Sequence, residues 1–75
     1  MNLKILRVMA RLTQAEAAEK VGVNQATISD WERGNYKPGA ASISKLAFAY
    51  NVDISDVLKA VEATSAEREA ADGTD

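Results

Sequence analysis

Apolar residues recur at helical spacing from the start of the chain. Leu3, Leu6 and Ala10 are separated by three and four residues, so they share one side of a helix over residues 2–10. Three more apolar side chains of this segment lie off that stripe: Ile5, Val8 and Met9. The pattern therefore predicts a first helix that buries one side and leaves apolar side chains on another.

The next signals mark helix starts and stops. Thr13 can cap a helix, and Glu16, three residues later, can complete a capping box. Gly22 follows at a point where a left-handed terminal residue is favoured. Asn24 is a suitable N-cap for the next helix, and Gly34 marks its end. The sequence thus predicts two short helices, at about residues 14–21 and 25–33, joined by a very tight turn.

Two further helices are expected after a loop at residues 35–39. The first runs from about residue 40 or 42 to residue 50, and its inner side is expected to carry Ile43, Leu46, Ala47 and Tyr50. Asp53 can cap the second, and Asp56 adds a favourable negative charge to its first turn. The expected inner residues of this fifth helix are Ile54, Val57, Leu58 and Val61.

The end of the chain differs in composition from the rest. Residues 64–75 are charged and contain no large apolar side chain, so they bury too little surface to offset the entropy of ordering. We expect either disorder here or an extension of the fifth helix. The sequence therefore predicts an all-α, compact five-helix domain over residues 1–63 and an acidic tail over residues 64–75.

The composition supports helices and excludes several kinds of chemistry. Hydrophobic residues make up 47% of the 75 residues and aromatic residues only 5%, which suits close helix packing better than a sheet. The sequence contains no Cys and no His, so disulfides, thiolate metal sites and the commonest general base are excluded. Because a Gly-rich phosphate loop is also absent, we expect no metal site, no catalytic residues, no cofactor and no enzymatic activity.

The distribution of apolar and basic residues also bears on location. No apolar run approaches the roughly 18 residues that a membrane span requires. Lys4, Arg7 and Arg11 interrupt the apolar part of the N-terminal segment, unlike the core of a secretory signal. A cytoplasmic location without membrane association is therefore expected.

The net charge of −2 conceals an asymmetry between the two parts of the chain. Residues 1–50 carry seven bases and four acids, which gives a net charge of +3. Residues 51–75 carry two bases and seven acids, which gives −5. Because docking depends on local field more than on total charge, the basic part remains a candidate surface for a polyanion.

The helix expected at residues 25–33 has two distinct sides. Ile28, Trp31 and Glu32 are separated by three and four residues, so they turn together towards the body of the domain. The opposite side carries Gln25, Ala26, Ser29, Asp30 and Arg33. A side made largely of short and amide side chains can approach a surface closely, whereas a row of long charged side chains would hold it away.

Such a side has the chemistry needed to contact DNA bases. Gln25 can pair bidentately with adenine, Ala26 can contact a thymine methyl group, and Asp30 can accept from a cytosine amino group. The alternative is that these polar residues solvate an ordinary surface helix.

Three stretches have the order and spacing of a known family: LKILR at residues 3–7, LTQAEAAEKVGVNQATISDWERGNYKPG at residues 12–39 and LAFAYNVDISDVL at residues 46–58. They resemble the lambda-repressor and Cro-like (XRE-type) helix-turn-helix domains of phage and bacterial transcription regulators. The resemblance implies that the helix at 14–21 lies across the DNA backbone and that the helix at 25–33 enters the major groove. It also implies a repressor or related regulator that binds a double-stranded DNA operator as a homodimer.

The resemblance assigns roles to individual residues. The implied base-reading residues are Gln25, Ala26, Ser29 and Asp30. Arg7 and Glu32 match a pair that forms an ion pair in many members, the alternative being two unrelated exposed charges. The implied phosphate contacts are Gln14, Asn24, Thr27, Arg11, Arg33, Asn35, Tyr36 and Lys37, where basic side chains and loop amides fix register without reading sequence.

Three positions depart from the family pattern. Gln25 and Asp30 stand where members often carry a basic residue, and Asp30 opposes the polyanion unless it pairs with Arg33 or a cytosine. Arg11 stands where the turn usually has Gly, so it is either a phosphate contact or a strained helix cap. We therefore expect weak affinity per subunit, for which a dimer would compensate.

A protein-interaction module with the same fold, such as an antitoxin or an anti-repressor, is the second candidate function. Relatives usually carry polar residues at four positions that are apolar here: Ile5, Val8, Met9 and Phe48. Four such residues can mark a surface for a protein partner. Fold alone does not decide between the two candidates.

Overall fold

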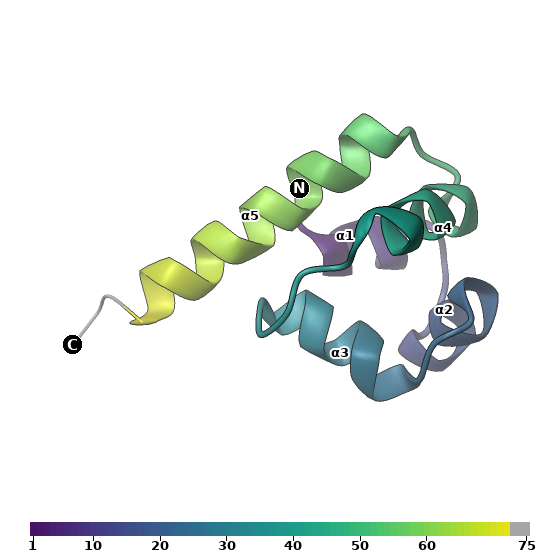
Figure 1. Cartoon of the computed structure of the whole chain (residues 1–75), viewed down its shortest axis with the longest axis horizontal. Coiled ribbons are helices and arrows are strands. Elements are labelled where there is room, and N and C mark those ends of the chain that lie inside the picture. The colour runs from purple at the N-terminus through teal and green to yellow at the C-terminus, as the bar shows by residue number, and fades with distance from the viewer. Residues whose placement is uncertain (73–75) are drawn as a thin grey trace.

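The computed structural model describes residues 1–72, and within this range every regular element is a helix. The elements are α1 (Leu3–Met9), α2 (Gln14–Val21), α3 (Gln25–Arg33), α4 (Ala40–Tyr50) and α5 (Ile54–Asp72). Helices α1 to α4 form a compact body, and the C-terminal half of α5 extends from it as a rod (Figure 1). The predicted all-α, five-helix class is therefore confirmed.

Local sequence determines where α2 and α3 begin and end. The hydroxyl of Thr13 accepts from the backbone N–H of Glu16 at 3.0 Å, and the Glu16 carboxylate accepts from the N–H of Thr13 at 2.9 Å. This is the predicted capping box. Gly22 and Gly34 end α2 and α3 with φ values of 84° and 78°, a left-handed conformation that costs an L side chain about 1–2 kcal/mol. Because α2 ends at Val21 and α3 begins at Gln25, the turn between them contains only three residues.

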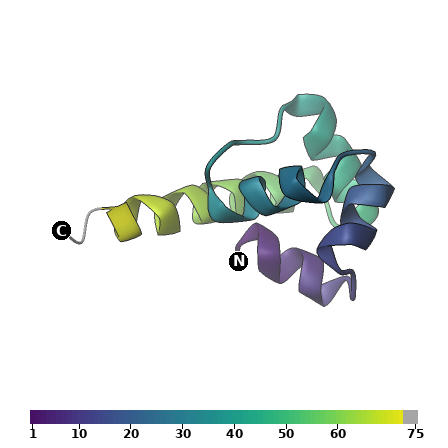
Figure 2. The same cartoon turned by 90° about the horizontal axis from the view of Figure 1, so that it is seen from below.

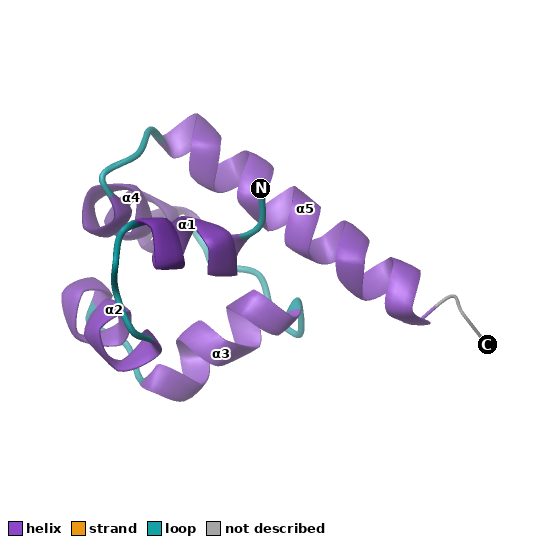
Figure 3. Ribbon diagram, turned by 180° about the vertical axis from the view of Figure 1, so that it is seen from behind, coloured by secondary structure: helices purple, strands orange, loops and turns teal. Residues whose placement is uncertain are grey.

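The core lies where the five helices meet. Helix α2 packs against α3 and α4, while α5 packs against α1, α3 and α4, as the views from below and behind show (Figures 2 and 3). The buried hydrophobic residues are Leu3, Leu6, Ala17, Ala18, Val21, Ile28, Trp31, Leu46, Ala47, Tyr50, Val57 and Ala60. The hydrophobic residues predicted to face inward on α1, α3 and α4 are among them or packed against them.

Helix α5 turns inward two of the four residues predicted to face the core: Val57 is buried and Val61 packs against the core. Val57 and Ala60 are fully buried, whereas Ile54 and Leu58 are 50% and 47% exposed. The prediction that Ile54 and Leu58 face inward is therefore wrong. It followed side-chain size, but the small side chain of Ala60 lets α5 approach its neighbours closely and so decides which side is buried.

The segment after residue 63 continues α5 as far as Asp72. The buried Thr64 hydroxyl accepts from the backbone N–H of Leu3 at 3.1 Å, and the Glu67 carboxylate accepts from the Asn2 amide at 3.0 Å. These contacts with the start of α1 provide the stabilisation that composition did not reveal. The expectation of disorder is thus corrected to the helical alternative for residues 64–72, while residues 73–75 lie outside the described residues.

Over residues 1–72, none of the helices combines the length and the hydrophobicity required to cross a bilayer.

Candidate nucleic-acid interface

Helix α3 is anchored on one side and open on the other. Ile28 is 1% exposed and Trp31 is 7% exposed, so both side chains hold the helix against the core. On the opposite side Gln25, Ala26 and Arg33 are exposed, and Ser29 and Asp30 are half-buried. The orientation predicted from helical spacing is therefore present, and the polar side of α3 is accessible.

A buried ion pair ties α3 to α1. The Arg7 guanidinium donates to the Glu32 carboxylate, with distances of 2.6 Å from Nε and 3.2 Å from Nη2, and to the carbonyl of Leu12 at 2.8 Å. The side chains of Arg7 and Glu32 are only 10% and 6% exposed. The structure thus contains the ion pair that the family resemblance implied, and the alternative of two unrelated exposed charges is excluded.

The ion pair and its burial shift the pKa values of Arg7 and of the neighbouring Tyr50. The hydrogen bond that Arg7 donates to Glu32 raises the pKa of Arg7 above its usual value, although burial opposes this. Burial raises the pKa of the Tyr50 hydroxyl to about 12, the negative charge of Glu32 adds to this shift, and Arg7 opposes it. The positive charge of Arg7 and the neutral form of Tyr50 are therefore both favoured in the folded domain.

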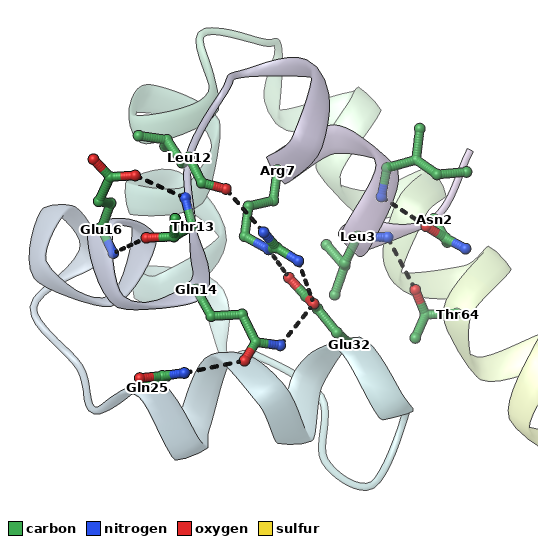
Figure 4. Close-up of polar contacts among 11 residues, drawn as sticks. Asn2, Leu3, Arg7, Leu12, Thr13, Gln14, Glu16, Gln25, Glu32 and Thr64 are labelled. Atoms are coloured by element: carbon green, nitrogen blue, oxygen red, sulfur yellow. Dashed lines mark hydrogen bonds and ion pairs between the residues drawn. The ribbon is translucent and has the colours of Figure 1, made fainter.

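A chain of hydrogen bonds connects the ion pair to the first residue of α3 (Figure 4). The Gln14 amide, at the first residue of α2, donates to Glu32 Oε1 at 3.1 Å. The Gln25 amide, at the first residue of α3, donates to Gln14 Oε1 at 3.4 Å. Helical spacing predicted that Gln25 is exposed but not that it is linked to the core through Gln14 and Glu32.

The implied phosphate-contacting residues border this face. Exposed among them are Arg11, Asn24, Arg33, Asn35, Tyr36 and Lys37, whereas Gln14 and Thr27 are half-buried. Arg11 has φ 61°, so its backbone is in the strained left-handed region while its side chain remains accessible. Asn24 precedes α3 but makes no side-chain capping hydrogen bond. The amide of Asn24 is therefore not committed to the helix start.

Sequence reasoning missed the part that α5 plays beside α3. Asn35 donates to the Asp30 carboxylate at 3.2 Å and accepts from Arg68 at 2.7 Å, which brings an α5 side chain to the end of α3. Arg68 lies four residues after the buried Thr64, which continues the stripe of Val57 and Ala60 at helical spacing. That spacing could have indicated that residues 64 and 68 lie on the buried side of α5. It was overlooked because Ala60, Thr64 and Arg68 are small or polar.

The four apolar residues proposed as a partner surface are all exposed, with Phe48 the most at 91%. Met9 lines a cleft of about 670 Å³ between α1, the end of α4 and the start of α5. Phe48 instead lines an adjoining, more open groove together with Ile54, and this groove shares Asn51 and Val52 with the cleft. The structure therefore places Met9 and Phe48 on different hollows.

Comparison with known proteins identifies the family to which α2, the turn and α3 belong. A sequence model described as "Helix-turn-helix" matches residues 3–57. The chain is 38% identical over 57 residues to an uncharacterised HTH-type transcriptional regulator of Methanocaldococcus jannaschii, covering 76% of this chain and 86% of that protein. It is 35% identical over 60 residues to the ImmF control region 10 kDa protein of Bacillus phage phi105, covering 80% and 66% of the two chains.

A longer protein of the same phage also matches. The immunity repressor protein of Bacillus phage phi105 is 29% identical over 57 residues, which cover 76% of this chain and 40% of the repressor. No solved structure matches the chain significantly. The family match spans most of the chain and includes α2, the turn and α3, and this protein therefore belongs to the helix-turn-helix family.

Proposed function

We propose that this protein is a sequence-specific, double-stranded-DNA-binding transcriptional regulator of the repressor type that inserts α3 into the major groove. The observation that carries the proposal is the geometry of α3, whose inner side is fixed by Ile28 and Trp31 and whose outer side is exposed. Rigid presentation of a short polar helix is what base reading in the major groove requires. The relatives described above include an HTH-type transcriptional regulator and an immunity repressor, which agrees with this function.

Gln25 is the residue best suited to read a base. Its one side-chain hydrogen bond within residues 1–72 goes to Gln14, which uses one of the two amide N–H donors. The other N–H and the amide oxygen are left for an external partner, and adenine presents the matching acceptor and donor in the major groove. Ala26 would contact a thymine methyl group, while Ser29 and Asp30 would reach neighbouring base edges.

The surrounding residues would position the domain on the backbone. Arg11, Arg33 and Lys37 supply positive charge. Five further candidates supply neutral donors: Gln14, Asn24, Thr27, Asn35 and Tyr36. Such contacts fix the register of the helix and make affinity depend on salt, but they carry no sequence information. A homodimer would place two copies of α3 about 34 Å apart, close to one turn of DNA.

Selection of bound duplexes from a random pool, followed by anisotropy titration on the selected site, tests the proposal. We expect a palindromic consensus in which Gln25→Ala removes discrimination at particular base pairs, at a cost of about 1–3 kcal/mol. Lys37→Ala should instead weaken binding to all sequences and flatten the salt dependence. Ser44→Ala, an exposed change on α4, is the matched control. A protein that shows no sequence preference at any salt concentration would refute the proposal.

A protein-interaction module remains the second candidate, because Ile5, Val8 and Met9 expose apolar surface along α1 beside a cleft. An antitoxin or anti-repressor would use such a surface for its main partner. A stable complex that persists in the Gln25→Ala variant but is lost on Met9→Lys would favour this function. An antitoxin that also represses its own operon would satisfy both candidates.

A further inference from the structure

A polar chain connects the end of α3 with the last turns of α5. Asn35 Nδ2 donates to Asp30 Oδ1 at 3.2 Å, and Arg68 Nη1 donates to Asn35 Oδ1 at 2.7 Å. The two hydrogen bonds use the opposite ends of one amide, so together they fix the direction in which that amide faces. Arg68 therefore orients the group that holds Asp30.

Close packing keeps Arg68 in place. A Cβ atom at Gly34 would lie 2.9 Å from Arg68 Cβ and 3.3 Å from the Thr64 carbonyl oxygen, so α5 directly contacts the end of α3. On the same stretch of α5, Thr64 and Glu67 bind the first residues of α1. The base of the exposed Arg68 side chain thus lies against the end of α3, on a stretch of α5 that is also bound to the start of α1.

The position of Asp30 makes this arrangement important for reading DNA. Asp30 is half-buried on the outer side of α3, the side that the proposed function turns towards a bound duplex. Asn35 occupies one carboxylate oxygen, which leaves the other for the amino group of a base. A carboxylate already held in one orientation loses less conformational freedom on binding and therefore discriminates better between bases.

We propose that Arg68 is a positioning residue for sequence reading, which acts through Asn35 to hold Asp30 in the orientation that meets a base amino group. This inference rests on the proposed DNA-binding function. It assigns to α5 a part in specificity besides its part in the core.

Arg68→Met is the informative variant, because it keeps the Cβ and Cγ atoms that pack near Gly34 and removes the guanidinium. Lys59→Met is the matched control, since it removes a positive charge from the same helix in the cleft beside α1. Each variant is titrated at constant salt against the selected duplex and its single-base-pair variants. We expect Arg68→Met to reduce discrimination roughly threefold to tenfold at one base pair, the one affected by Asp30→Ala, with other positions and the Lys59→Met control unchanged.

Two further measurements separate this role from others. In an Asp30→Ala background, Arg68→Met should not reduce discrimination further, because the residue it positions is gone. In the free protein, the side-chain amide resonances of Asn35 should shift in Arg68→Met and stay unchanged in Lys59→Met. Both readouts are insensitive to a general loss of stability, which urea unfolding of the same variants measures separately.

The opposite results overturn the inference. Uniform weakening on all duplexes with a flatter salt dependence would make Arg68 a phosphate contact. Unchanged discrimination, or unmoved Asn35 amide resonances, would also exclude the positioning role. A wild-type protein without sequence preference would refute the proposed function itself, whereas a discriminating wild type with an equally discriminating Arg68→Met variant would overturn this inference alone.

Discussion

The buried ion pair between Arg7 and Glu32 fixes α3 to α1, so its removal should destabilise the whole domain. Arg7→Met removes three hydrogen bonds, two to the Glu32 carboxylate and one to the Leu12 carbonyl. It leaves Glu32 buried with Gln14 as its remaining partner among residues 1–72. Glu32→Leu does the reverse and leaves the guanidinium with the Leu12 carbonyl alone.

The size of the effect follows from burial. Because both side chains are at most 10% exposed, removing one partner leaves an uncompensated buried charge, which costs about 3–5 kcal/mol. A chain of 75 residues has a total free energy of unfolding of about 4–11 kcal/mol. Each single substitution should therefore remove about a quarter or more of the stability. The double variant carries no unpaired charge and should cost no more than the worse single one, which corresponds to a coupling of about 3 kcal/mol or more.

Urea unfolding followed by helical circular dichroism measures these quantities. For a domain this small, a loss of 3 kcal/mol lowers the urea midpoint by roughly 2–3 M. Lys4→Met, which removes an exposed base from α1, is the control and should shift the midpoint little. Single substitutions that each cost under about 1 kcal/mol, or costs that simply add in the double variant, would refute the proposed role of the ion pair.

Three further predictions concern caps, packing and pH. Thr13→Ala should cost about 1 kcal/mol in urea unfolding, because it removes one half of the capping box. Gly34→Ala should cost more than Gly22→Ala although both have positive φ, because only the Cβ at residue 34 meets Arg68 within the described residues; equal losses would contradict this packing. Burial raises the folded-state pKa of Tyr50 to about 12 from 10.0, so its contribution to stability is complete below pH 10 and lost as pH rises towards 12. Wild type should thus lose stability more steeply than Tyr50→Phe in that window, and parallel curves would refute the shift.

Much of the fold follows from residues a few positions apart. The capping box of Thr13 and Glu16, the glycine ends of α2 and α3, and the inward side of α3 depend on contacts within one or two helical turns. Such contacts depend on spacing and residue type, which the sequence states directly. The boundaries of the first four helices, and the buried sides of α1, α3 and α4, could therefore be predicted.

The side and the length of α5 could not be predicted in the same way. The segment around Thr64 is ordered by Asn2 and Leu3, which are about sixty positions away in the sequence. Apart from Val57, the stripe that α5 buries is made of small and polar side chains, Ala60 and Thr64, so hydrophobicity favoured Ile54 and Leu58 instead. Both the buried side of α5 and its length are therefore determined by contacts with residues far away in the sequence.

The candidate site shows the same division. Helical spacing predicts that Gln25 and Ala26 are exposed. It does not reveal that Gln14, which lies on another helix, joins Gln25 to Glu32 by hydrogen bonds. Likewise, nothing local indicates that Arg68 binds Asn35. The exposed side of α3 was predictable, whereas the contacts that hold its residues were not.

The insertion of α3 into the major groove is tested most directly by replacing single adenines of the selected duplex with 7-deazaadenine. This base lacks the N7 acceptor of the major groove and leaves the minor groove and the base pairing unchanged. At the adenine contacted by Gln25, the replacement should weaken binding of wild type by about 1–3 kcal/mol and leave binding of Gln25→Ala unchanged. Equal binding of wild type to every modified and unmodified duplex would contradict a major-groove contact by this helix.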